Sequence, residues 1–170
     1  MKFLADGMVG RLARWMRLIG CDVEYLNDIP DDQLLKRAVA EHRTLLTSDV
    51  ALYRNAVAKG VDAFLVSGKD QVEKLAKVAK RYDLRLEVNT NISRCPTCGS
   101  PIKKVAKTEI KGKIPLTTFK AYNEFWICNN QDCGKVYWQG SHWRKIDEVL
   151  TRANELLSKQ DQTRREGASS

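Results

Sequence analysis

Three aspartates stand at positions where a parallel β-sheet would bring them together. Asp6 follows a short apolar run at residues 3–5, and Asp49 closely follows another at residues 44–47. Asp31 begins a helical pattern that leads into the second of these runs. Because the segments that follow parallel strands meet at one edge of the sheet, we expect the three carboxylates to gather there. At neutral pH such a group needs a proton or a bound cation to offset its repulsion.

A hard divalent cation such as Mg²⁺ or Mn²⁺ suits a site made of carboxylate oxygens. Such an ion can activate a water for attack on a phosphodiester and stabilise the leaving oxygen. The pattern therefore predicts catalytic, metal-binding roles for Asp6, Asp31 and Asp49, with Asp28 and Asp32 as nearby alternatives. Each aspartate also has a structural explanation, since Asp31 could cap a helix and Asp49 could start one. A fourth acid and the number of metal ions stay open.

Two other functions are compatible with the same residues. One is a non-catalytic protein that binds RNA or the ribosome, which an intact set of acids argues against. The other is a phosphatase or receiver-like domain, which also places an acid after its first strand. Asp6 is followed by Gly7 and Met8, so the Asp-x-Asp pair of haloacid-type phosphatases is missing.

Four of the five cysteines form two pairs with the spacing of a zinc site. The pairs are Cys95 with Cys98 and Cys128 with Cys133, and each is followed by a glycine. Tight turns can present two thiolates each to a tetrahedral Zn²⁺ ion. A closed four-cysteine site has no open position for a reacting water, so we expect this zinc to be structural. Cys21 is interpreted as a buried core residue.

Cationic and aromatic side chains suggest how a polyanion would bind. Arg11, Arg14 and Arg17 recur every three residues on a helical pattern, either as a solvated face or as phosphate contacts. Seven of the 13 aromatics lie after residue 118, interleaved with lysines that include Lys103 and Lys104. These aromatics could stack on bases or form the small core of the module. His142 could contact a phosphate, although a structural hydrogen bond is the simpler explanation.

The first half of the chain alternates short apolar runs with helical patterns. Strands are expected at residues 3–5, 23–26, 44–47 and 61–66. Helices are expected after each strand, with ends near residues 20, 42, 59 and 82. This alternation predicts an α/β fold whose parallel sheet is flanked by helices on both faces.

The second half changes character near residue 89. Residues 95–140 contain β-prone segments with almost no helical period and are expected to form a small zinc ribbon. Ser141 is placed to cap a helix over residues 141–158, whose apolar stripe contains Trp143, Ile146, Leu150, Ala153 and Leu157. We therefore expect an α/β domain at residues 1–88, the ribbon, the helix, and a disordered polar tail at residues 159–170.

Composition narrows the class of protein. The net charge is +8, and residues 89–170 carry 14 Lys and Arg against 8 Asp and Glu. A basic chain favours a polyanionic partner, which we expect to be RNA, with tRNA, rRNA or the ribosome as candidates. No run is long enough for a membrane span, and the N-terminal segment lacks a signal-peptide pattern. We therefore expect a cytoplasmic protein that does not bind membranes, with reduced thiols.

Several of these motifs resemble the Mut-7 C-terminal ribonuclease family. The segment at residues 3–17, FLADGMVGRLARWMR, is similar to the opening of that family, and the segments DDQLL at 31–35 and LLTSD at 45–49 resemble its second and third acidic motifs. The CPTC segment at 95–98 and the segment at 133–143 resemble its zinc ribbon and closing motif. The resemblance spans about residues 3–150. It implies a PIN-like nuclease domain followed by a zinc ribbon, with Asp6, Asp31 and Asp49 as catalytic acids.

Overall fold

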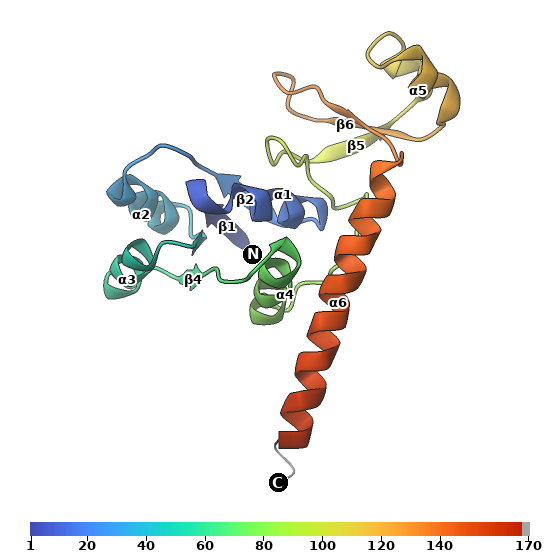
Figure 1. Ribbon diagram of the computed structural model, residues 1–170. Coiled ribbons are helices and arrows are strands. Elements are labelled where there is room, and N and C mark those ends of the chain that lie inside the picture. The colour runs from blue at the N-terminus through green and yellow to red at the C-terminus, as the bar shows by residue number, and fades with distance from the viewer. Residues whose placement is uncertain (168–170) are drawn as a thin grey trace.

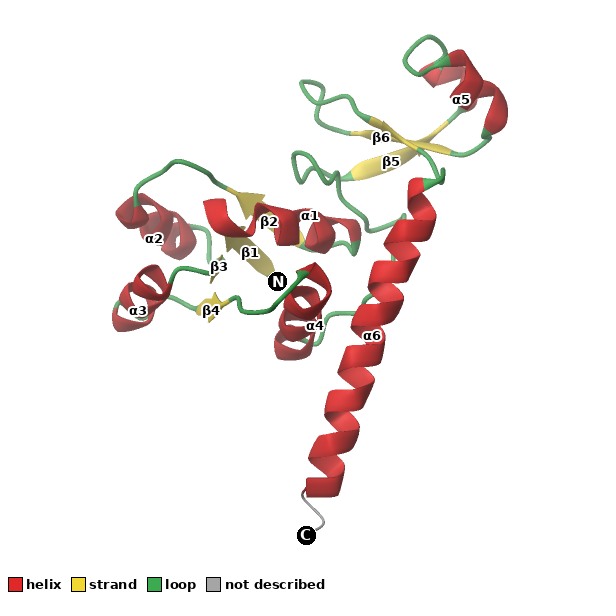
Figure 2. Cartoon of the chain, viewed as in Figure 1, coloured by secondary structure: helices red, strands yellow, loops and turns green. Residues whose placement is uncertain are grey.

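A computed structural model describes residues 1–167, with side chains through Lys159. Figures 1 and 2 show a parallel sheet flanked by helices, a small second sheet beside it, and one long helix that runs past both. The elements of the first half, in chain order, are β1 (Lys2–Ala5), the 3₁₀ turn η1 (Gly7–Val9), α1 (Gly10–Leu18), β2 (Asp22–Tyr25), α2 (Asp31–Ala40), β3 (Thr44–Thr47), α3 (Val50–Ala58), β4 (Ala63–Leu65) and α4 (Gln71–Tyr82). The elements of the second half are β5 (Ile102–Val105), the 3₁₀ turn η2 (Lys107–Ile110), α5 (Leu116–Ala121), β6 (Phe125–Cys128), β7 (Val136–Tyr137) and α6 (His142–Gly167).

The first sheet is entirely parallel, with the strand order β2-β1-β3-β4. The α/β prediction is therefore confirmed. β1 lies in the middle, where Leu4 pairs with Glu24 of β2 on one side and with Leu45 of β3 on the other. Asp6 continues this pairing, because its backbone N–H donates to the carbonyl of Leu46 at 3.2 Å.

Alternate residues of the central strands face two separate cores. Phe3 and Ala5 of β1 belong to one core, which is completed by residues of α1, α4 and α6. Leu4 belongs to the other, which is completed by residues of α2 and α3. The strands thus carry apolar residues on both faces because helices cover both, as expected for a parallel sheet.

The second sheet is antiparallel, in the order β5-β6-β7. Phe125 of β6 and Ile110 of η2 are both fully buried. The expectation of almost no helix in residues 95–140 is wrong, because η2 and the two-turn helix α5 lie between β5 and β6. Pro115 precedes α5 in extended conformation, a position that proline tolerates at a helix start.

Helix α6 lies along α4 and joins the first core through Leu150 and Ala153. The predicted helical stripe is confirmed for these residues and for Ile146 and Leu157, which pack against the same core. The helix extends beyond the bound expected at residue 158 and continues to Gly167, into the segment expected to be a disordered tail; residues 168–170 lie outside the described part. Among the described residues, no helix is both long enough and apolar enough to span a membrane.

Candidate active site and metal centre

Asp6 and Asp49 are connected at the carboxyl edge of the parallel sheet through one threonine hydroxyl. The hydroxyl of Thr47 donates to Oδ2 of Asp6 and accepts from the backbone N–H of Asp49 at 2.8 Å. Thr47 is fully buried and Asp6 is only 4% exposed. The other oxygen of Asp6, Oδ1, accepts from the backbone N–H of Met8 at 2.8 Å, which caps the 3₁₀ turn. Thr47, the last residue of β3, thus binds the carboxylate of Asp6 and the backbone N–H of Asp49.

Asp49 begins helix α3 as its N-cap. Its Oδ1 accepts from the backbone N–H groups of Ala51 and Leu52, at 2.6 and 3.0 Å. The expectation that Asp49 starts a helix is therefore correct, but the cap uses only one of the two carboxylate oxygens. The side chain is exposed. Oδ2 receives no hydrogen bond from the described residues and remains available to a ligand.

Asp31 is the first residue of α2, and its exposed side chain makes no capping hydrogen bond. Pro30 occupies the N-cap position, so the capping explanation for Asp31 is wrong. Because α2 follows β2 in a parallel sheet, this residue begins its helix at the edge where Asp6 and Asp49 lie. Within the described residues, the three aspartates do not form a close group of ligand atoms of the kind that the cysteines form.

The three aspartates share an absence of positive partners. In the described part of the chain, no lysine or arginine forms an ion pair with Asp6, Asp31 or Asp49. Asp6 is therefore a buried carboxylate held by one hydroxyl and one backbone N–H alone. Burying a charge without a counterion is costly, so this edge suits a cation.

Sequence reasoning missed two residues beside Asp6. One is Thr47, and the other is Asn27, whose side-chain oxygen lies 2.4 Å from where a Cβ would stand on Gly7. A side chain at Gly7 would displace Asn27, and one at Gly10 would collide with the ring of Tyr25 at 2.7 Å. The glycines after Asp6 thus allow the loop after β2 to approach the carboxyl edge. An amide oxygen from Asn27 adds to the oxygen ligands available there.

The four paired cysteines come together as predicted. All four Sγ atoms lie within 4.8 Å of one another; the Sγ–Sγ distance is 3.7 Å for Cys95 and Cys133 and 3.4 Å for Cys98 and Cys128. A tetrahedral zinc site with Zn–S bonds of about 2.3 Å has sulfur separations of about 3.8 Å. The thiols are free rather than disulfide-bonded. The group could therefore hold a metal ion such as zinc.

The ionisation of these thiols also favours a cation. Burial opposes ionisation of Cys98, yet hydrogen bonds from Ser100 and from neighbouring thiols lower its pKa to about 6. Burial raises the pKa of Cys128 and of Cys133, and the nearby thiols contribute to both increases. The thiolate of Cys98 thus forms readily, whereas ionisation of Cys128 and Cys133 is suppressed. A bound metal ion would stabilise the thiolate form of all three. Tyr137 supplies an outer contact, with its hydroxyl 2.9 Å from Sγ of Cys95.

The predicted phosphate contact at Arg17 is wrong, because this side chain is only 4% exposed. Its guanidinium donates to the carbonyls of Val23, Pro96 and Thr97, at 2.9, 3.1 and 3.1 Å. Burial lowers the pKa of Arg17, and the nearby Cys98 and Cys95 oppose that shift. Arg17 therefore ties α1 to the first cysteine turn instead of facing a ligand.

The other predicted RNA contacts are at the surface. Arg11 and Arg14 are exposed on α1, and neither forms an ion pair within the described residues. Lys103 and Lys104 are exposed on β5, and Lys104 pairs with Glu124. His142 is exposed at the first position of α6, and no hydrogen bond joins its ring to any described residue. The structural hydrogen bond expected for His142 is therefore not found.

The fold and the two sites define a class: an α/β domain with acids at its carboxyl edge, joined to a four-cysteine ribbon. A sequence model of the Mut7-C RNAse domain matches residues 1–150, which include both sites. The chain belongs to the Mut7-C RNAse domain family. The curated proteins gave no match, and neither did the solved structures.

Proposed function

We propose that this protein is a Mg²⁺- or Mn²⁺-dependent ribonuclease that cleaves RNA phosphodiester bonds. The observation that carries the proposal is the buried carboxylate of Asp6, which has no positive partner among the described residues and is linked through Thr47 to Asp49. Membership of a family described as an RNAse domain supports the same activity. A divalent cation at this edge would offset the buried charge and bring a phosphate to the acids.

Asp6, Asp31 and Asp49 would hold the ion. When bound, it would activate a water for attack on phosphorus and stabilise the charge on the leaving oxygen. Thr47 fixes the orientation of Asp6 by donating to Oδ2, and the cap of α3 leaves Oδ2 of Asp49 available. Helices α2 and α3 and the 3₁₀ turn all start at this edge, and their N–H groups make the surroundings favourable for a phosphate.

Surface cations would position the RNA backbone. Arg11 and Arg14 project from α1, which begins four residues after Asp6, so they lie close to the carboxyl edge. Lys103 lies on the ribbon, where Lys104 is already paired with Glu124. We therefore assign the nearest phosphate contacts to the α1 arginines, with lysines of the ribbon as more distant ones. Candidate substrates are tRNA and rRNA.

The four cysteines would hold a structural Zn²⁺ ion. Their sulfurs surround a closed site, and Arg17 joins one cysteine turn to α1. Thiolates need a reducing compartment to remain metal ligands, and we therefore propose a cytoplasmic location. The zinc module would hold the ribbon in a fixed position against the nuclease domain.

A non-catalytic RNA-binding protein remains the second candidate, because Asp31 does not join Asp6 and Asp49 in a close ligand group. The deciding experiment is cleavage of labelled single-stranded RNA by the zinc-loaded protein, with and without added Mg²⁺ or Mn²⁺. Metal-dependent cleavage is the expected result. RNA binding without cleavage under every metal condition would favour the second candidate.

The variant Asp49→Asn sharpens this test. Asparagine also caps helices well, so α3 should remain intact while one ligand charge is lost. We expect cleavage to fall below detection while RNA affinity stays similar or rises, since a like charge has gone. Cleavage at the wild-type rate would show that Asp49 is not a ligand of the catalytic metal ion.

A further inference from the structure

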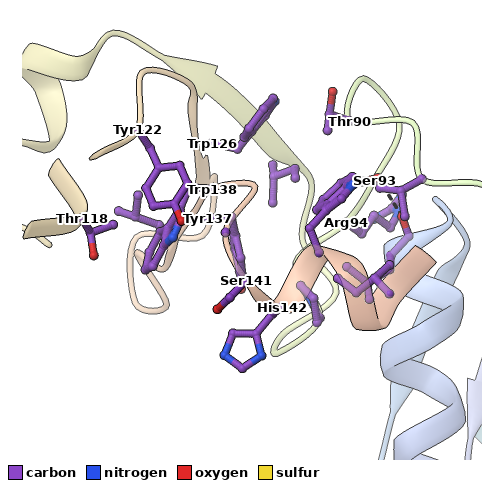
Figure 3. Close-up of a pocket in the computed structure, with 18 residues that line it drawn as sticks. Thr90, Ser93, Arg94, Thr118, Tyr122, Trp126, Tyr137, Trp138, Ser141 and His142 are labelled. Atoms are coloured by element: carbon purple, nitrogen blue, oxygen red, sulfur yellow. Dashed lines mark hydrogen bonds between the residues drawn. The ribbon is translucent and has the colours of Figure 1, made fainter. Parts of the chain in front are cut away.

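We infer that a cavity between the ribbon and the end of α1 binds one unpaired nucleobase of the RNA. The cavity has a volume of about 500 Å³, within the range of about 300–1,000 Å³ typical of small-ligand pockets. Figure 3 shows its walls, and we call it the aromatic pocket. Five aromatic side chains line it: Tyr122, Trp126, Tyr137, Trp138 and Trp143. The inference rests on the proposed ribonuclease function, because it identifies the substrate as RNA with an unpaired nucleotide.

The ribbon supplies the stacking surfaces. Tyr122 and Trp138 form a pair with their ring centroids 6.5 Å apart and an interplanar angle of 39°. Both are half-buried, so each keeps a surface that water can reach. Gly140 allows this arrangement, since a Cβ there would stand 2.8 Å from the indole nitrogen of Trp138. Aromatic rings that are held in place but partly exposed are the usual platforms for single-stranded bases.

The opposite wall is held rigidly against α1. Ser93 is buried, and its hydroxyl contacts the carbonyls of Leu18 and Asn89 at 2.7 and 2.8 Å. The backbone N–H of Arg94 donates to the carbonyl of Arg17 at 2.9 Å. The connecting segment thereby satisfies the last carbonyls of the helix. A preformed wall reduces the entropy that a ligand must lose on binding.

The polar groups of the pocket match a base rather than a cation. Thr118, Ser141 and His142 line it, and no side-chain hydrogen bond to these three residues is found within the described part of the chain. They can therefore donate to, or accept from, the edge of a base. Arg94 is the one lysine or arginine that lines the cavity, and its guanidinium already lies 3.6 Å from Asp22 and donates to the carbonyl of Gly99 at 3.0 Å. None of the 18 lining residues is an aspartate or glutamate, so no acid of the lining would repel the phosphate of a nucleotide.

The pocket also lies at a useful distance from the acids. Leu18, the last residue of α1, lines the pocket, whereas Asp6 lies just before the first turn of the same helical segment. The nine residues of α1 span about 14 Å at about 1.5 Å per residue. Arg11 and Arg14 are exposed on that helix between the two sites. A single strand following α1 would thus place its phosphates near these arginines and a base in the pocket.

A base cannot be paired in a double helix and bound in the aromatic pocket at the same time, because entering the pocket requires it to leave its helix. The pocket therefore selects single-stranded segments or loops. It fixes the register of the strand relative to Asp6, so that cleavage occurs at a set distance from the bound base.

The test measures binding, independently of cleavage. A short fluorescent single-stranded RNA and its abasic derivatives, each lacking one base, are titrated with full-length zinc-loaded protein by fluorescence anisotropy. No divalent cation and no chelator is added, so the strand stays intact and zinc stays bound. The wild type is compared with Trp138→Leu and with the matched control Phe119→Leu, since Phe119 is a half-buried ribbon aromatic outside the pocket.

We expect Trp138→Leu to weaken binding about tenfold, the usual cost of one lost base stack, while Phe119→Leu changes it less than twofold. Removing one particular base should weaken wild-type binding by a similar factor and leave the Trp138→Leu protein unaffected. If all abasic strands bind the wild type equally, or if both leucine variants match the wild type, the pocket does not bind a base. Wild-type cleavage in that case would leave the nuclease proposal standing.

The reverse outcome is also informative. If the wild type cleaves nothing yet shows the base-dependent loss at Trp138, the pocket assignment holds and the nuclease proposal fails. Trp138→Phe should retain most of the affinity, because a ring remains for stacking. Bound zinc and thermal unfolding are measured for every variant, and Tyr122→Leu replaces Trp138→Leu if the latter loses zinc. If a folded Tyr122→Leu protein still loses as much RNA affinity as the wild type when that one base is removed, the pocket does not bind the base.

Discussion

The two edges of the parallel sheet both carry acidic residues, but those at the amino edge are paired with arginines, whereas the three aspartates at the carboxyl edge have no such partner among the described residues. At the amino edge, Arg43 pairs with Asp22 and Glu41 and also reaches Glu24 within β2; its guanidinium lies 2.9, 2.6 and 3.4 Å from their respective oxygens. Arg37 adds contacts to Glu24 and Glu41 at 3.0 and 2.7 Å. At the carboxyl edge, no described cation pairs with any of the three aspartates.

Acids that have an arginine partner can stabilise the fold, whereas the acids without one at the carboxyl edge are those that we propose bind a metal ion. A carboxylate with an arginine partner gains stability from its charge, whereas a buried carboxylate without one lowers stability. Proteins retain such uncompensated groups mainly at functional sites. Arginine partners would have neutralised the aspartates of the carboxyl edge and so argued against a metal site there; no such pair is found among the described residues.

The sharpest test of this contrast compares Asp6→Asn with Asp22→Asn. Asp6→Asn should lower RNA cleavage by roughly a hundredfold to a thousandfold, since it removes a carboxylate that we propose holds the catalytic metal ion. The same change should leave the fold as stable or more stable, because it removes a buried, unpaired charge. Asp22→Asn should do the reverse, with normal cleavage and weaker resistance to urea. Equal loss of stability in both variants would mean that the two edges do not differ.

The positions of the acids could be predicted from the sequence because they depend on simple rules. Apolar runs at residues 3–5 and 44–47 give strands, alternation with helices gives a parallel sheet, and parallel strands end at one edge. The spacing of the cysteines was equally informative, since tetrahedral thiolate coordination requires two tight turns.

Side-chain partners across strands could not be predicted in this way. The contact of Thr47 with Asp6 depends on the register between β3 and β1, which the sequence pattern does not specify. Arg17 was misassigned for a geometric reason. A step of three residues falls about 60° short of a full helical turn, so the repeat from Arg11 drifts around α1 toward its buried side.

Arg43→Met tests the amino edge from the cation side. The arginine side chain is only 12% exposed and also donates to the carbonyl of Phe3 at 3.2 Å. Its loss removes the cation that Asp22, Glu24 and Glu41 share and leaves them only the contacts with Arg37 and Arg94, which should lower the free energy of unfolding by about 3 kcal/mol. Urea unfolding followed by circular dichroism measures this. Cleavage measured well below the melting temperature should remain normal, and a large loss there would show that the amino edge contributes to catalysis.

Two threonines of β3 offer a matched pair at opposite ends of one strand. Thr47 donates to Asp6 at the carboxyl edge, and Thr44 donates to Asp62 at 2.6 Å at the other end. Replacing either by valine removes one buried hydroxyl and should cost about 1 to 2 kcal/mol of stability. Thr47→Val should also lower cleavage about tenfold, because outer contacts orient metal ligands. If Thr44→Val reduces cleavage equally, the effect is general loosening of the strand.

The smallest expected effect is the dependence of stability on acid pH, and it arises at the amino edge. Burial alone would raise the pKa of Asp22, but the hydrogen bond and charge of Arg43 outweigh it and lower that pKa. The hydrogen bond from Arg43 is also the main cause of the lowered pKa of Glu41. Acids with lowered folded-state pKa values contribute stability that is complete above their unfolded pKa values, about 3.9 and 4.3. This contribution is lost as the pH falls through the folded pKa values.

The melting temperature of the wild type should therefore decrease as the pH is lowered below about 4. Asp22→Asn should start from a lower melting temperature at neutral pH and show a shallower decrease, because the ion pair that acid would break is already absent. A profile for Asp22→Asn as steep as that of the wild type would show that the arginine-paired acids do not set the acid sensitivity of the fold.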